Sequence, residues 1–248
     1  MTKHFIEYLL TAALAVMTAQ SCVSKIDPIF DESSANRVEA LAERLNETLT
    51  GAPNGWLLEY YPSSGQYYGG FNVFLSFSEG NKVKVGSEVA GKGKTATSTY
   101  SIYQSAGCVL TLDTYNEVMH YFADPETTGG QGAGFGFEGD FEFNVLDLQD
   151  EKITLKGRKT GSTMTMTPMP VSMSWDDYIV ALKEEESAIS KHTRIRYQTA
   201  DNKYDGRING RTLEIFSEVD GEQVTTSYPF IFNLMGVTFY KPLELGDE

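Results

Sequence analysis

The sequence has little cysteine and little histidine, and this scarcity limits the metal chemistry expected of it. Its 248 residues include 2 cysteines and 3 histidines. His120 follows Glu117 by three residues, which is neither the helical two-histidine zinc motif nor another standard metal spacing. We therefore expect no metal and no cofactor, and we expect His120 to be a hydrogen-bonded structural residue.

Positively charged residues are also scarce. The chain has 20 Lys and Arg against 34 Asp and Glu, which gives a formal net charge of −14. Such an acidic surface repels nucleic-acid phosphates and anionic lipid head groups. Nucleic acid is therefore not an expected partner. The 41% of hydrophobic and 12% of aromatic residues are enough for a packed core.

No apolar run is long enough to form a permanent membrane span. The N-terminal run from Tyr8 to Ala19 has 12 residues, whereas a spanning helix needs about 20. Lys3 and His4 precede it, which is the layout of a secretory signal. The sequence predicts a signal peptide over residues 1–21.

The apolar run ends in Ala19-Gln20-Ser21-Cys22, which resembles a bacterial lipobox. The resemblance implies that Cys22 carries lipid and that residues 22–30 form a tether. Several acyl chains on one cysteine hold a protein firmly on a membrane. The alternative is cleavage nearby that leaves Cys22 as a free thiol.

With Cys22 lipidated, Cys108 has no cysteine with which to form an internal disulfide. It begins the apolar, strand-like run Cys108–Leu112. This context predicts a buried structural cysteine rather than a nucleophile.

Two segments have the hydrophobic period of an amphipathic helix. The first runs from about Ser33 to Thr50, and the second runs from a capping Ser174 to about Lys191. The apolar face of the first contains Val38, Leu41, Leu45 and Leu49, and that of the second contains Trp175, Ile179, Leu182 and Ile189. We expect both faces to pack onto sheet.

Short runs rich in aromatic and β-branched residues, separated by turn signals, predict antiparallel strands. Before the second helix they are Gly55–Tyr61, Gly70–Ser78, Lys82–Val89, Thr97–Tyr103, Cys108–Asp113, Val118–Phe122, Phe137–Leu148, Lys152–Arg158 and Thr163–Thr167. After it they are Thr193–Thr199, Arg211–Val219, Gln223–Phe232 and Val237–Pro242. Glu79-Gly80-Asn81 and Gln149-Asp150-Glu151 are the clearest hairpin turns.

This order predicts a mainly β (α+β) fold. So many consecutive strands before the second helix favour an antiparallel meander that forms an open barrel or a sandwich, with the N-terminal helix packed on it. We assign residues 31–170 to this domain and residues 171–248 to a second helix-plus-strands module. The strand-forming Leu234–Tyr240 lies near the end of the sequence, so we expect the second module to be incomplete and less stable.

One stretch between two predicted strands is dense in aromatic residues. Tyr67, Tyr68 and Phe71 are candidate ligand-binding residues, because exposed aromatic rings stack on sugars or anchor partner proteins. We expect the nearby Trp56 to lie in the core. For Tyr67 and Tyr68, burial in the core remains the alternative.

Acidic residues gather between Asp113 and Asp140. Asp124, Glu126 and Asp140 are weak candidates for calcium binding, since Ca²⁺ prefers oxygen ligands, but a solvated acidic rim explains them as well. The same stretch is the only plausible location for a hydrolase using paired carboxylates.

Four segments together resemble a known family: Ala52–Pro62, Gly69–Asn72, Leu112–Phe122 and Ile153–Gly157. They are similar to domain of unknown function 4302, an uncharacterised lipoprotein family of Bacteroidota. The family has no established activity. Its members look like accessory lipoproteins encoded beside outer-membrane nutrient-uptake systems.

The resemblance implies a non-catalytic protein that is lipid-anchored at the outer membrane, on the cell-surface or periplasmic face. It would bind a glycan or peptide, or an uptake complex. The alternative is a lipid-anchored hydrolase that uses the acidic residues of the 113–140 region.

Overall fold

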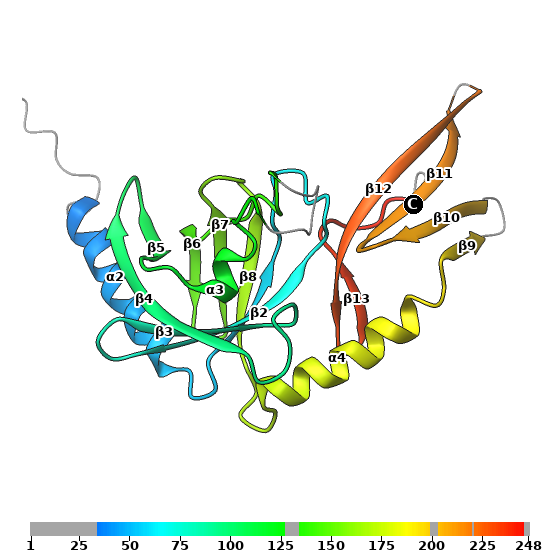
Figure 1. Ribbon diagram of the computed structural model, residues 1–248. Coiled ribbons are helices and arrows are strands. Elements are labelled where there is room, and N and C mark those ends of the chain that lie inside the picture. The colour runs from blue at the N-terminus through cyan, green and yellow to red at the C-terminus, as the bar shows by residue number, and fades with distance from the viewer. Residues whose placement is uncertain (1–33, 127–133, 199–202, 220, 246–248) are drawn as a thin grey trace, which may run out of the picture. The chain divides into compact units, whose positions relative to one another are not determined.

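The computed structural model describes residues 34–126, 134–198, 203–219 and 221–245 (Figure 1). The predicted signal peptide and tether, with Cys22, lie outside these residues. The chain divides into two compact units, Met1–Arg37 and Val38–Glu248, and every strand belongs to the second. Within the described residues, no helix has the length and apolar character needed to cross a membrane.

Helix α2, Ser34–Gly51, packs its apolar face on the sheet that follows, as predicted. Leu45 and Leu49 are fully buried. The indole N–H of Trp56 donates to the carbonyl of Leu49 at 3.0 Å. This bond satisfies a carbonyl in the last turn of α2, which has no partner within the helix.

Eight antiparallel strands form a closed barrel in the order β1 to β8 (Figure 1). They are β1 Trp56–Tyr60, β2 Phe71–Ser78, β3 Lys82–Ser87, β4 Thr95–Gln104, β5 Cys108–Leu112, β6 Glu142–Gln149, β7 Lys152–Gly157 and β8 Thr163–Pro168. The mainly β fold class is confirmed.

The barrel is closed rather than open because β1 pairs on both sides. Leu58 of β1 lies opposite Val73 of β2 and Met166 of β8, and all three side chains are buried. Closure leaves no barrel strand with a free edge, which removes the edge exposure that a meander of this length would otherwise have.

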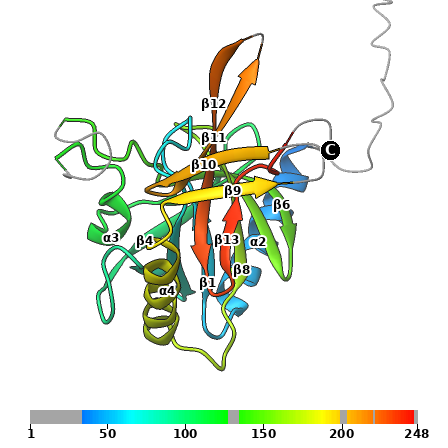
Figure 2. The ribbon, with the colours of Figure 1, turned by 90° about the vertical axis from the view of Figure 1, so that its right-hand side faces the viewer.

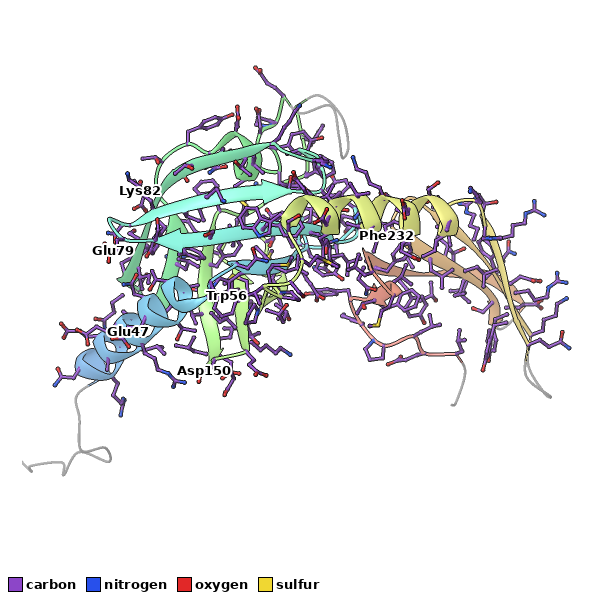
Figure 3. All side chains as sticks on the ribbon, turned by 90° about the horizontal axis from the view of Figure 1, so that it is seen from below. Glu47, Trp56, Glu79, Lys82, Asp150 and Phe232 are labelled. Atoms are coloured by element: carbon purple, nitrogen blue, oxygen red, sulfur yellow. The ribbon has the colours of Figure 1, made fainter. Side chains whose placement is uncertain are left out.

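Both predicted hairpins are present. Gly80 and Asn81 turn β2 into β3 with φ of 73° and 55°, a left-handed conformation that glycine and asparagine adopt readily. The second turn joins β6 to β7 at Asp150 and Glu151. Figure 3 labels Asp150, Glu79 and Lys82 at these hairpins.

The predicted strand Val118–Phe122 is wrong, because Glu117–His120 forms the short helix α3. The side chain of Asn116 accepts hydrogen bonds from the backbone N–H groups of Val118 and Met119. This local cap supplies hydrogen-bond acceptors for two backbone N–H groups, which in a strand would need a neighbouring strand as their partner.

The strand predicted to begin at Phe137 begins instead at Glu142. Gly136 and Glu138 have φ of 56° and 57°, which is incompatible with an extended strand. Residues 137–141 therefore belong to a loop.

The second helix, α4, covers Trp175–Ile189 and is capped as predicted by Ser174, whose hydroxyl accepts from the N–H of Asp177 at 3.1 Å. A five-stranded sheet follows in the order β13-β12-β11-β10-β9. Its strands are β9 Arg194–Gln198, β10 Lys203–Asn209, β11 Thr212–Val219, β12 Glu222–Asn233 and β13 Gly236–Phe239. Figure 2 shows α4 beside β12 and β13.

Strand β10 was not predicted from the sequence. It pairs with β9 and β11, and Gly206 lies at its centre where a Cβ would approach the carbonyl oxygen of Glu214 to 2.6 Å. Glycine and alternating charged residues give this strand a weak signal. Its partners compensate for that low propensity.

The core of the second sheet includes a barrel residue. Phe74 of β2 is fully buried, yet it belongs to the cluster formed by α4 and the second sheet. Its ring lies 5.5 Å from both Trp175, in a stacked arrangement, and Tyr178, edge to face. The second sheet therefore packs around a side chain that the outer face of the barrel provides.

Candidate ligand-binding site

A cavity of about 940 Å³ lies where the loop between β1 and β2 meets the second sheet. This volume lies within the range of small-molecule sites, roughly 300 to 1,000 Å³. Its barrel side includes Gln66, Tyr67, Tyr68, Phe71 and Phe137. Its sheet side includes Asn209, Arg211, Thr212, Glu214, Thr226, Ser227, Tyr228 and Tyr240.

The loop on the barrel side is fixed by hydrogen bonds. The hydroxyl of Ser162 donates to the carbonyl of Ser63 at 2.7 Å, and the amide of Gln66 donates to the Ser162 hydroxyl oxygen at 2.9 Å. Gly70 N–H donates to the carbonyl of Phe230 at 3.0 Å. The loop is therefore held both to the barrel and to β12.

Gly69 is required by the close approach of the loop to the sheet. It has φ of 68°, and a Cβ there would lie 2.7 Å from the carbonyl oxygen of Phe230. Any larger residue would push the loop away from β12. This explains one of the two glycines that follow the tyrosine pair.

All three aromatic candidates line the cavity. The Tyr67 side chain is 68% exposed, whereas Tyr68 is half-buried and Phe71 is buried. Tyr68 and Phe71 both pack edge to face against Phe137, at 5.2 and 5.4 Å. Tyr67 is thus the ring available to a ligand, while the other two form an aromatic base.

The opposite wall presents polar groups held in place by their neighbours. Glu214 accepts hydrogen bonds from Arg207 at 2.5 Å and from Asn209 at 3.0 Å. The bond from Arg207 and, to a lesser extent, the bond from Asn209 hold the pKa of the Glu214 carboxyl below its usual value. Glu214 therefore stays ionised as a hydrogen-bond acceptor near neutral pH.

Arg211 joins the two sides of the cavity and had no sequence signal. Its guanidinium donates to the carbonyl of Gly70 at 2.6 Å, to Glu88 at 2.9 and 3.2 Å, and to Glu186 at 3.1 Å. Its Cζ lies 4.5 Å from the centre of the Phe71 ring. Only 12% of the side chain is exposed.

Glu88 connects this arginine to a further buried network. Its carboxylate is 4% exposed and accepts from the backbone N–H of Asn72 at 2.6 Å. The side chain of Asn72 donates to the carbonyl of Phe232 at 2.9 Å and accepts from the hydroxyl of Tyr178 at 3.3 Å. Burial, together with nearby Glu88, raises the pKa of Tyr178 to about 12, so this phenol stays a donor.

The three calcium candidates are not brought together. The carboxylate of Asp140 accepts from the N–H groups of Lys159 and Thr160, at 2.6 and 3.1 Å, and from the Thr160 hydroxyl. Asp124 accepts from the N–H of Glu126 at 2.8 Å. The part of the chain that the structure describes has no group of three or more His, Cys, Asp or Glu placed to hold a metal ion.

His120 and Cys108 have the structural surroundings that the sequence predicts. The Nδ1 atom of His120 lies 3.1 Å from the carbonyl oxygen of Asn116, and its ring stacks on Phe141 at 4.7 Å. Burial lowers the pKa of His120. Cys108 is buried, which raises the pKa of its thiol and disfavours the reactive thiolate.

Comparison with known proteins gives one match. Residues 26–248 match the family model of a domain of unknown function, DUF4302, so the chain belongs to this family. Searches of curated proteins and of solved structures give no significant match.

Proposed function

We propose that this member of the DUF4302 family is a non-catalytic binding protein, anchored by lipid at the outer membrane, that presents a glycan to a nutrient-uptake system. The observation that carries the proposal is the cavity between the loop of Tyr67 and the second sheet. It combines an exposed aromatic ring on a fixed loop with polar groups on the opposite wall.

This combination suits a sugar. A sugar ring has an apolar C–H face that stacks on an aromatic side chain, and hydroxyl groups that both donate and accept hydrogen bonds. Tyr67 supplies the ring, and Asn209, Thr212 and Glu214 supply donors and acceptors. A peptide would need anchoring pockets for its side chains, and a protein that binds peptides instead would bind none of the saccharides in the test below.

Three observations favour binding over hydrolysis. Glu214, a carboxylate of the cavity wall, has a lowered pKa, whereas a general acid needs a raised one. In the 113–140 region, the carboxylate of Asp140 already accepts hydrogen bonds from two backbone N–H groups and from the Thr160 hydroxyl. None of the acidic residues described in that region lines the cavity.

The anchor is proposed from the sequence. Replacing Cys22 by Ala should move the protein from the membrane to the soluble fraction, because the acyl chains provide the attachment. Unchanged membrane association, measured by fractionation and immunoblotting, would refute lipidation at Cys22 and would leave the binding proposal standing.

Binding is tested by isothermal titration calorimetry with a panel of neutral oligosaccharides of glucose, xylose, mannose and galactose. Tyr67→Ala should weaken binding of the sugar that the wild type prefers by roughly tenfold or more, since each factor of ten corresponds to about 1.4 kcal/mol. Tyr115→Ala is the matched control, because Tyr115 is also 68% exposed but does not line the cavity. Failure of every saccharide to bind, or equal weakening by both variants, would refute the proposal.

A further inference from the structure

The main cavity continues onto one open face of the second sheet. A cavity of about 500 Å³ is lined by Arg194, Arg196, Asp205, Arg207 and Phe216, and one of about 440 Å³ by Lys203, Asp205, Phe216, Glu218 and Gln223, among others. Residues directly paired across antiparallel strands project to the same face. Arg207 pairs with Glu214, and Asp205 pairs with Phe216, so these residues share one face of the sheet.

The three cavities adjoin one another along this face. Glu214 lines the main cavity and bonds to Arg207, which lines the second. Asp205 and Phe216 line both the second and the third. From Asn209 to Lys203 along β10 the distance is about 20 Å, at about 3.3 Å per residue.

The face offers a repeating set of hydrogen-bonding groups. Arg196 donates to Asp205 at 2.6 Å, and Arg207 donates to Glu214 at 2.5 Å. The side chains of Arg196, Asp205 and Arg207 remain half exposed or more. Each pair holds its partners in place, and the exposed Arg196, Asp205 and Arg207 retain N–H groups and oxygen lone pairs for a ligand.

The two faces of this sheet differ in what they bury. Leu213 and Ile215 lie on the other face and are buried in the core with α4. The open face carries side chains of both signs in nearly equal number, which favours a ligand without net charge; they are Arg194, Arg196, Lys203, Arg207, Asp205, Glu214 and Glu218. Phe216 is the aromatic residue of this array, with the Arg207 guanidinium 5.9 Å from the centre of its ring.

We infer that the ligand is an extended, neutral, polyhydroxylated chain, bound at one end beside Tyr67 and along its length by the open face as far as Phe216. This inference rests on the proposed function and adds the length of the ligand and a second contact region. An oligosaccharide would then bind more tightly than its own short fragments, because each added unit meets another set of donors and acceptors.

The test is calorimetry on the full chain with linear oligosaccharides, from monosaccharide to hexasaccharide, of glucose, xylose and mannose. Affinity should rise at least tenfold from the disaccharide to the hexasaccharide of the sugar that binds. Phe216→Ala and Arg196→Gln should each remove most of this rise and leave disaccharide affinity unchanged. Tyr67→Ala should weaken every length.

The outcomes separate the two proposals. The extended site would be overturned if affinity depended on Tyr67 but not on chain length, and if Phe216→Ala and Arg196→Gln both bound like the wild type. That result would leave the proposed function intact. If no saccharide of any length binds, both are overturned. Circular dichroism of each variant verifies that its fold is retained, and Arg196→Gln provides the measurement if Phe216→Ala does not fold.

Discussion

The barrel and the second sheet both consist of antiparallel strands, but the strands of the two regions are buried in different ways. Every barrel strand has two strand neighbours, and the barrel encloses its own core beneath α2. The second sheet has β9 and β13 as edges, one polar open face, and a core that includes Phe74 of the barrel. A closed barrel is complete in itself, whereas an open sheet of this size depends on its neighbours.

The open sheet also suits the proposed binding function. An open sheet keeps one face available to solvent, while the interior of the barrel is filled by side chains such as Leu58, Val85 and Ile153. The candidate site accordingly lies where the rigid barrel fixes a loop against the open sheet. Three predictions test how far the two regions differ.

The largest effect should come from a matched pair of leucines. Leu45 of α2 and Leu182 of α4 are both fully buried, one against the barrel and the other against the second sheet. Each change to Ala should cost about 2 to 5 kcal/mol of unfolding free energy. Leu182→Ala should reduce hydrogen-exchange protection mainly in β9–β13, and Leu45→Ala should reduce it in the barrel.

Limited proteolysis gives an independent measurement of the same contrast. Leu182→Ala should be cut first after the Pro168–Pro170 segment, leaving a resistant N-terminal fragment. Loss of protection in both sheets at once, in both variants, would mean that the two regions unfold as one cooperative unit.

The next effect concerns the ion pair that joins the regions. Glu88→Gln removes the charge that Arg211 contacts and weakens the bond from Asn72 N–H, so it should cost about 1.5 to 3 kcal/mol, as hydrogen bonds to charged groups do. Urea denaturation measures this loss. Asp150→Asn is the control, because its 3.5 Å pair with Arg44 is exposed and should contribute less than about 1 kcal/mol. Equal effects of the two changes would show that the Glu88 network does not hold the sheet to the barrel.

The smallest effect should come from His120 on the barrel. Burial lowers its pKa below the ordinary value of 6.5, so the unfolded chain binds this proton more tightly than the folded chain does. Stability is therefore fully present above about pH 6.5 and declines as the pH falls toward the lowered pKa. The change in Tm should be smaller than the roughly 2–4 °C that 1 kcal/mol produces in a chain of this size.

Thermal unfolding from pH 8 to pH 5 measures this decline. His120→Gln should flatten it relative to the wild type, whereas the exposed His192→Gln should not. A steeper decline in His120→Gln than in the wild type would contradict the assigned sign.

Much of the local structure could be predicted from sequence because its causes are local. The apolar spacing of α2 and α4, the cap at Ser174 and the turn at Gly80-Asn81 each act over a few residues. The errors arose where a local interaction competed with a pattern, as Asn116 did in capping α3. They also arose where partners compensated for weak propensity, as in β10.

The sequence predicted the aromatic residues of the candidate site but not its charged residues. Tyr67, Tyr68 and Phe71 stand out as a run of aromatic residues beside glycine, and all three line the cavity. Arg211 and Glu88 could not be predicted as site residues, because they lie 123 positions apart and each alone resembles any other charged residue of the sequence.

The sequence by itself determined both long helices, most of the strands and the side chains of α2 and α4 that face a core, and it showed that aromatic residues gather beside Gly69. The tertiary structure alone decided that β1 closes the barrel with β8, that Phe74 points outward into a second core, and that Arg211 meets Gly70 across the cavity. The reason is physical. Helical and strand periods depend on neighbours a few residues away, whereas closure and ion pairing depend on groups that only the folded chain brings within bonding distance.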